Sequence, residues 1–197
     1  PDRLHLIVGG TAESGAVAAT IELMADGSLR QTAESPVGEA GGYISVDRTG
    51  RYYLSTHYRS ALVATHALGD GAVVGPVVTS TRTPNLEAHC IVTTPDNRFV
   101  YVPCVKTNNA IFQYAFDEST GELSALEPFD AKPPAMFGPR HVVYHPDLPL
   151  AYFSNEQQLG VSVYTIAEDG QLSALQHATT VPRRAPFDRE KRALSAS

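Results

Sequence analysis

The sequence predicts an all-β fold, a β-propeller of four-stranded antiparallel blades, on the basis of three observations. Two kinds of turn recur along the chain at intervals of about fifty residues. The runs between these turns are rich in β-branched and aromatic residues and lack the helical apolar period. Gly and Pro are frequent, at 15 and 14 of 197 residues, as expected for short strands joined by turns. Four strands in each period of roughly 40–50 residues are the signature of propeller blades.

The first recurring unit is an apolar run, a turn and a second apolar run. It occurs as "YISVDRTGRYYLSTHY" (43–58), "CIVTTPDNRFVYVPCV" (90–105) and "HVVYHPDLPLAYFSNE" (141–156). The turns fall at Thr49-Gly50, Asp96-Asn97 and Asp147-Leu148, and such residues are typical of tight turns. Each unit is therefore predicted to be the inner hairpin of one blade.

The second recurring unit is a glycine turn that follows a β-rich run and precedes a further short strand. It occurs as "ADGSL" (25–29), "GDGAV" (69–73), "STGEL" (119–123) and "EDGQL" (168–172). The glycine of each, at positions 27, 71, 121 and 170, is expected to adopt a positive φ. Each period thus contains a second, outer hairpin.

These units divide the chain into a partial propeller of about four blades. The predicted blades cover residues 1–38, 42–80, 88–128 and 140–179, and residues 180–197 are predicted to form a loop toward the next blade. The first blade is expected to lack its innermost strand. We therefore expect the chain to be a fragment, with the remaining blades of the propeller supplied by the rest of a longer chain.

Composition excludes several classes of partner. The net charge is −6, and the Arg-rich segment near the end also carries acidic residues, so nucleic acid is not an expected partner. No apolar run approaches the roughly 20 residues of a membrane-spanning helix, so no membrane association is expected. The two cysteines, Cys90 and Cys104, favour a reduced, cytoplasmic protein. They are expected to be buried thiols and cross-strand neighbours in one hairpin.

Three polar residues occupy matching places in neighbouring hairpins. If the turn of the last hairpin covers residues 147–149, Arg140 lies directly opposite Glu156, on the same face of the sheet. His89 and Arg140 each precede their hairpin turn by the same number of residues. His89, Arg140 and Glu156 are therefore predicted to gather at one rim of the central channel, where ligands bind in such folds.

Each of these residues also has a structural interpretation. Arg140 and Glu156 could form a cross-strand ion pair worth about 0.2–1 kcal/mol. His89 could be a hydrogen-bonded rim histidine. His141, adjacent to Arg140, is expected to face the other side of the sheet and pack between blades. No cluster has zinc-like spacing, so neither a catalytic metal nor a cofactor is predicted.

The motifs "AHCIVTTPDNRFVYVP" (88–103), "GPRHVVYHPDLPLAYFSNE" (138–156) and "VSVYTIAEDGQLSALQ" (161–176) resemble the seven-bladed lactonase propellers. That family comprises propeller-type 6-phosphogluconolactonases and carboxymuconate cyclases. The resemblance implies a seven-bladed fold and a catalytic set of His89, Arg140, Glu156 and a further Arg in a blade beyond residue 197.

The resemblance implies hydrolysis of a small-molecule sugar lactone resembling 6-phosphogluconolactone. His89 or Glu156 would then serve as acid or base and Arg140 would stabilise an anion. His57, expected opposite Tyr43, and Asn155 are predicted to bind the substrate. Two alternatives remain: a carboxymuconate cycloisomerase, which needs the same acid/base and anion clamp, and a non-catalytic propeller scaffold that binds a protein partner.

Overall fold

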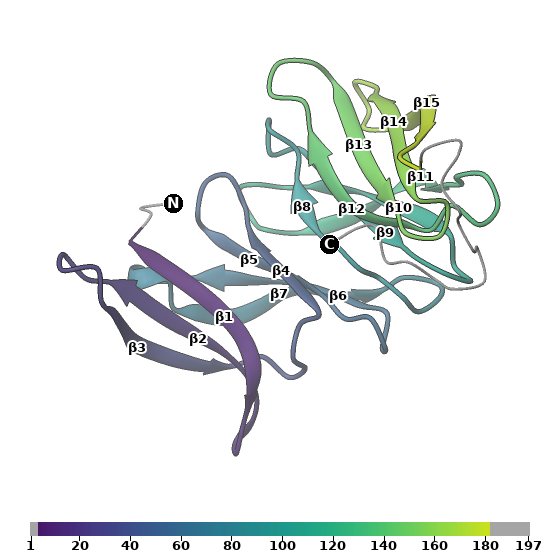
Figure 1. Ribbon diagram of the computed structural model, residues 1–197. Helices are drawn as coiled ribbons and strands as arrows, with labels where there is room; N and C mark the ends of the chain where they lie inside the picture. The colour runs from purple at the N-terminus through teal and green to yellow at the C-terminus, as the bar shows by residue number, and fades with distance from the viewer. Residues whose placement is uncertain (1–3, 182–197) are drawn as a thin grey trace.

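The computed structural model describes residues 4–181, and these form four consecutive antiparallel sheets (Figure 1). The predicted all-β propeller class is confirmed. The first sheet has three strands, β1 (His5–Ala12), β2 (Gly15–Leu23) and β3 (Leu29–Pro36). The second has four, β4 (Tyr43–Val46), β5 (Tyr52–Thr56), β6 (Leu62–Leu68) and β7 (Val74–Arg82), with the 3₁₀ turn η1 (Asp70–Ala72) before β7.

The third and fourth sheets repeat the four-stranded pattern in chain order. The third contains β8 (Val92–Thr93), β9 (Phe99–Cys104), β10 (Ala110–Phe116) and β11 (Leu123–Ala131). The fourth contains β12 (Pro139–Tyr144), β13 (Leu150–Asn155), β14 (Gly160–Ile166) and β15 (Leu172–Thr179). The segment predicted as a loop at 180–197 lies, from residue 182 onward, outside the described residues.

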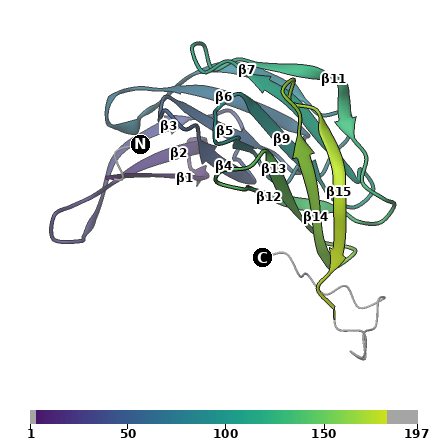
Figure 2. The ribbon, with the colours of Figure 1, turned by 90° about the horizontal axis from the view of Figure 1, so that it is seen from above.

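The sheets follow one another along an open arc rather than a closed ring (Figure 2). In this view β4 and β12, the first strands of their sheets, lie on the concave side, and β7 and β11, the last strands, lie on the convex side. Successive strands are antiparallel, so the turns inside each inner and outer hairpin lie at one edge of the arc. The loops between the second and third strands, and the connections between sheets, lie at the other edge.

The core lies between neighbouring sheets. Side chains of β9 alternate between two clusters: Val100 and Val102 pack toward the second sheet, and Phe99 and Tyr101 pack toward the fourth. A strand buried on both faces is expected to be apolar throughout, because successive side chains point to opposite faces. All six residues of β9 are indeed buried.

Cys90 and Cys104 are free, buried thiols, as expected, but they are not cross-strand partners. Cys104 pairs with Ala88, and the two cysteines belong to different core clusters on opposite faces of the third sheet. The strands of this hairpin pair in a different register from the predicted one, so Cys104 faces Ala88 rather than Cys90. Burial raises the pKa of both thiols.

The glycine of each outer hairpin has a positive φ, as predicted. At Gly121 the turn also lies against the Tyr52 ring of the preceding sheet, and the Tyr52 hydroxyl donates to the Ser119 carbonyl at 2.9 Å. The same arrangement recurs one sheet later, where Gly170 lies on the ring of Phe99. Turn and aromatic ring therefore join neighbouring sheets, and glycine is needed for space as well as for backbone conformation.

Replacing Gly121 by alanine is expected to lower the free energy of unfolding by about 2–4 kcal/mol. A Cβ atom there would lie 2.3 Å from the Tyr52 ring, and the backbone has φ +80°. Urea denaturation measures the change. Gly27→Ala is a matched control, since Gly27 has φ +83° but a Cβ there would meet nothing within 4 Å. Equal losses in the two variants would show that the contact with the ring is not important for stability.

No helix in residues 4–181 is long and apolar enough to cross a membrane.

Candidate functional site

The structure brings His89, Arg140 and Glu156 together at the edge of the arc away from the hairpin turns. His89 lies just before β8, where its backbone N–H donates to the Pro103 carbonyl of β9 at 2.9 Å. Arg140 is the second residue of β12, and Glu156 directly follows β13. Two neighbouring sheets therefore supply the three side chains.

Arg140 is the centre of this cluster. Its Nε atom donates to Nε2 of His89 at 2.9 Å and lies 3.6 Å from Oε2 of Glu156. The side chains of Arg140 and Glu156 are 18% and 11% exposed. The group is thus largely shielded from solvent but still accessible, a setting in which charge interactions are stronger than in water.

Arg140 and Glu156 are not directly opposite, so the predicted register is wrong in detail. The Glu156 N–H donates to the Gly138 carbonyl at 2.8 Å, and Pro139 pairs with Asn155. Two departures explain this. The turn is one residue longer than predicted, because the His145 N–H bonds to the Leu150 carbonyl, and the register shifts again between Pro139 and Val142.

The two shifts, each of one residue, leave Arg140 and Glu156 on the same face of the sheet as diagonal neighbours. Side-chain facing alternates with a period of two, so a total displacement of two residues preserves it. Diagonal neighbours are within reach of long side chains. The predicted contact therefore forms in spite of the wrong pairing.

The sequence predicts that His141 faces the other side of the sheet from Arg140, and this prediction is wrong, because the His141 ring lies beside His89. The β-bulge places both Arg140 and His141 opposite Ser154, and the His141 N–H donates to the Ser154 hydroxyl at 3.3 Å. The His141 ring lies 5.1 Å from the His89 ring, centre to centre, in an edge-to-face arrangement. A bulge re-aims side chains in this way because an extra residue interrupts the strand alternation.

The hydrogen bond from Arg140 fixes the protonation of His89. Its Nε2 atom accepts, so in the neutral ring Nδ1 carries the hydrogen. Among the described residues, neither this Nδ1 nor Nη1 of Arg140 has a hydrogen-bond acceptor, although both atoms are buried. Buried donors without acceptors are costly, and a bound water or a substrate oxygen would supply the missing acceptors.

His89 is neutral at pH 7. Burial, followed by the positive charge of Arg140 and by His141, lowers the pKa of His89 to about 4. The pKa of His141 is also lowered, mainly by burial and by Arg140, with Glu156 acting in the opposite direction. A neutral imidazole beside a permanently charged guanidinium is therefore the resting form of the site.

Arg140→Gln is expected to raise the pKa of His89 from about 4 toward its ordinary value of 6.5. The cation is removed, while burial, the larger cause, keeps the pKa below 6.5. Histidine NMR titration of the purified protein measures this. Arg98→Gln is the control, because Arg98 bonds to the Glu168 carbonyl at the opposite edge. An unchanged His89 titration in Arg140→Gln would show that the guanidinium does not hold the ring neutral.

The lowered pKa of His89 also affects the stability of the folded protein. The depressed pKa means that the unfolded chain binds this proton before the folded chain does as the pH falls. The contribution of His89 to stability is therefore complete above pH 6.5 and is lost progressively toward pH 4.

His57 and Asn155, the predicted substrate-binding residues, are not part of this cluster. His57 is 3% exposed, and its ring nitrogens lie 3.1 Å from the Ser55 hydroxyl and from the Ala40 carbonyl. It also does not oppose Tyr43, which pairs with Thr56. Asn155 is fully buried and donates to the Ser162 hydroxyl at 2.9 Å. Substrate contact by either residue stays a prediction that these hydrogen bonds do not favour.

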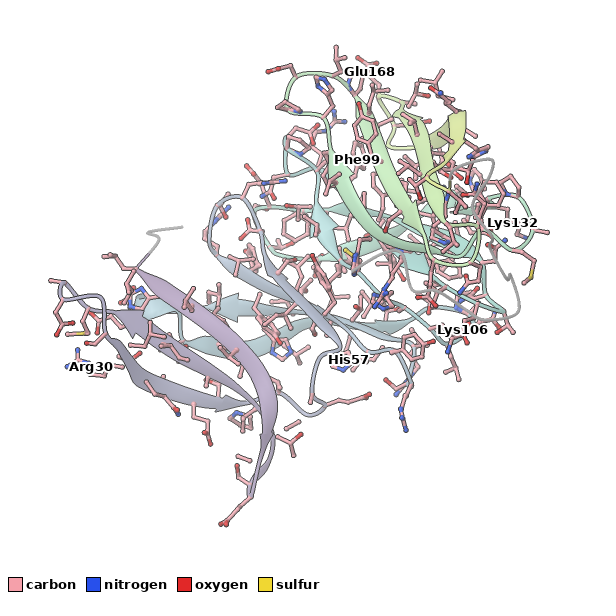
Figure 3. The ribbon with its side chains drawn as sticks, viewed as in Figure 1. Arg30, His57, Phe99, Lys106, Lys132 and Glu168 are labelled. Atoms are coloured by element: carbon pink, nitrogen blue, oxygen red, sulfur yellow. The ribbon has the colours of Figure 1, made fainter. Side chains whose placement is uncertain are left out.

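Three residues that the sequence analysis did not select lie beside the cluster. The Tyr58 ring is 6.0 Å from the His89 ring, and the Lys106 ammonium lies 5.3 Å from the centre of the Tyr58 ring. The Gln157 side chain donates to Oε1 of Glu156 at 3.0 Å. All three lie in loops after the second strand of a sheet, and topology places these loops at this edge. Figure 3 shows Lys106 there, opposite Glu168 in an outer hairpin turn.

No group of three or more His, Cys, Asp or Glu side chains within the described part of the chain is arranged to hold a metal ion.

Fold and cluster together define a propeller-type protein with an Arg–His–Glu cluster at one edge of its arc of sheets. The chain belongs to the family described as Lactonase, 7-bladed beta-propeller, whose model matches residues 2–196. It is 33% identical over 184 residues to a 6-phosphogluconolactonase of Cronobacter sakazakii, covering 92% of this chain and 54% of that protein. It is also 33% identical over 176 residues to a 6-phosphogluconolactonase of Serratia proteamaculans, covering 86% and 50%.

The fold is similar to a solved structure of a periplasmic gluconolactonase from Pseudomonas aeruginosa. The TM-score is 0.80 at 23% identity, over 95% of this chain and 57% of that one. The chain spans about half the length of the curated relatives it matches.

Proposed function

We propose that the protein hydrolyses a sugar lactone, with 6-phosphogluconolactone as the first candidate substrate. The observation that carries the proposal is the pair of buried donors, Nδ1 of His89 and Nη1 of Arg140, beside the carboxylate of Glu156. Hydrogen-bond donors fixed in advance suit the oxyanion that forms when water attacks an ester carbonyl. The names of the relatives support the same substrate class.

In the first step, Glu156 acts as general base. Its Oε2 atom accepts a proton from water as the water oxygen bonds to the lactone carbonyl carbon. The carbonyl oxygen becomes an oxyanion and accepts a hydrogen bond from Nη1 of Arg140, while Nδ1 of His89, on the far side of its ring, donates to another oxygen of the lactone. The sequence alone does not distinguish His89 from Glu156 as the general base. The bond from Arg140 to Nε2 favours Glu156, because it occupies the only lone pair of the imidazole.

In the second step, the tetrahedral intermediate collapses. The carbonyl re-forms, the bond to the ring oxygen breaks, and this oxygen takes the proton that Glu156 received. The product is the open hydroxy acid, which ionises at neutral pH and releases one proton to solvent. The chain's own residues account for every proton in this sequence.

Lys106 supports a substrate with a negatively charged substituent. Its side chain is exposed, and interaction with Tyr58 is the main cause that raises the pKa of Lys106, so the ammonium is fully charged at pH 7. An exposed cation at the same edge as Arg140 would attract a phosphorylated lactone.

The experiment compares 6-phosphogluconolactone, gluconolactone and a carboxymuconate as substrates of the purified protein. Acid release from the lactones above the spontaneous rate, faster for the phosphorylated one, is the expected result. Conversion of the muconate without lactone hydrolysis would favour a cycloisomerase. Absence of turnover with all three would favour a propeller scaffold that binds a protein.

A further inference from the structure

One side-chain amide connects the Glu156 carboxylate to the neighbouring sheet. Nε2 of Gln157 donates to Oε1 of Glu156 at 3.0 Å. Oε1 of the same amide accepts from the backbone N–H of Lys106 at 3.2 Å. Lys106 lies in the turn between β9 and β10, so the amide spans from the fourth sheet to the third.

The backbone around Gln157 is shaped to admit this amide. A Cβ atom on Gly138 would lie 1.3 Å from Oε1 of Gln157, and Gly138 has φ +63°, so both space and conformation require glycine. The Gly138 N–H donates to Oδ1 of Asn109 at 2.8 Å, and the Gly138 carbonyl accepts from the Glu156 N–H at 2.8 Å. The amide is therefore held in a defined place rather than free in solvent.

The Glu156 carboxylate has several charged or titratable neighbours that could reorient it. Arg140 and His141 approach from β12, and Lys106 from the β9–β10 turn. A carboxylate left free to rotate could pair with the Arg140 guanidinium through both oxygens, the geometry that this pair prefers. The amide of Gln157 holds Oε1 and leaves only Oε2 beside Arg140.

We propose that Gln157 is a positioning residue that orients the Glu156 carboxylate for proton transfer by tying it to the β9–β10 turn of the neighbouring sheet. The proposal rests on the function proposed above, in which Oε2 accepts a proton from water. Orientation matters because a misplacement of about 1 Å can cost roughly 100-fold in rate.

Gln157→Leu removes both hydrogen bonds and is expected to lower kcat for lactone hydrolysis by about 10–100-fold, with KM changed less than about threefold. Gln157→Glu keeps an acceptor for the Lys106 N–H but cannot donate to Glu156, so a similar loss is expected. Gln176→Leu is the matched control, because Gln176 is exposed on β15, and it should leave kcat unchanged. Thermal denaturation of each variant checks that it is folded.

A double-mutant cycle with Glu156→Gln separates positioning from general structural support. If Gln157 acts through the carboxylate, Gln157→Leu should lower kcat by less than about twofold once Glu156 is already glutamine. Losses that simply multiply, or wild-type kcat in Gln157→Leu alone, would overturn the positioning role. Wild-type kcat in Glu156→Gln alone would instead overturn the proposed function, and the inference with it.

Discussion

Replacing Arg140 by alanine is expected to lower kcat/KM for lactone hydrolysis by about 100–1000-fold. The variant removes the Nη1 donor proposed to contact the oxyanion. It also removes the Nε bond that fixes the His89 ring. One side chain thus serves two parts of the site, so the expected loss is at least that of removing a single oxyanion donor.

Arg140→Lys distinguishes geometry from charge. A lysine keeps the positive charge but cannot direct separate N–H groups to His89 and to substrate, so it should restore less than about a tenth of the lost activity. Arg98→Ala removes an exposed arginine at the opposite edge and should have wild-type kinetics. Steady-state kinetics on variants with native circular dichroism decide the matter. If Arg140→Ala keeps more than about a third of the activity, the ion pair with Glu156 is only structural.

The fold could be predicted from the sequence because its signals are local and periodic. Turn glycines such as Gly121 and Gly170 need a positive φ, and that requirement is visible in the sequence itself. The continuous apolar run of β9 likewise indicates a strand buried on both faces. The rings beneath these glycines come from the preceding sheet, about seventy residues earlier, so the packing requirement at Gly121 could not be seen locally.

The candidate site was only partly predictable. The repeat predicts equivalent positions for His89 and Arg140 and places Glu156 facing Arg140. The predicted pairing is wrong by two residues, but the side chains of Arg140 and Glu156 are long enough to meet. The placement of His141 depends on a β-bulge, a single extra residue that has no reliable signal in the sequence. Gln157 and Lys106 meet across two sheets, and the contact depends on how those sheets pack rather than on spacing along the chain.

The second large effect is expected at His89, where two substitutions by amides should behave differently. The amide nitrogen of asparagine can occupy the place of Nδ1, whereas the amide of glutamine reaches the place of Nε2. If the ring serves as a neutral donor to the lactone, His89→Asn should keep kcat/KM within about tenfold of wild type, and His89→Gln should lose about 100-fold or more.

The contrast between the two variants separates three roles for the ring. An imidazole that transfers protons cannot be replaced by any amide, so both variants would lose activity equally. A ring needed only to accept the Arg140 Nε bond would be better replaced by glutamine, and the order of the two variants would reverse. A pKa of about 4 already argues against protonation of His89 at neutral pH, because the charged ring would face Arg140. Kinetics of the two variants, with His89→Leu as the baseline that lacks both polar atoms, therefore test donation itself.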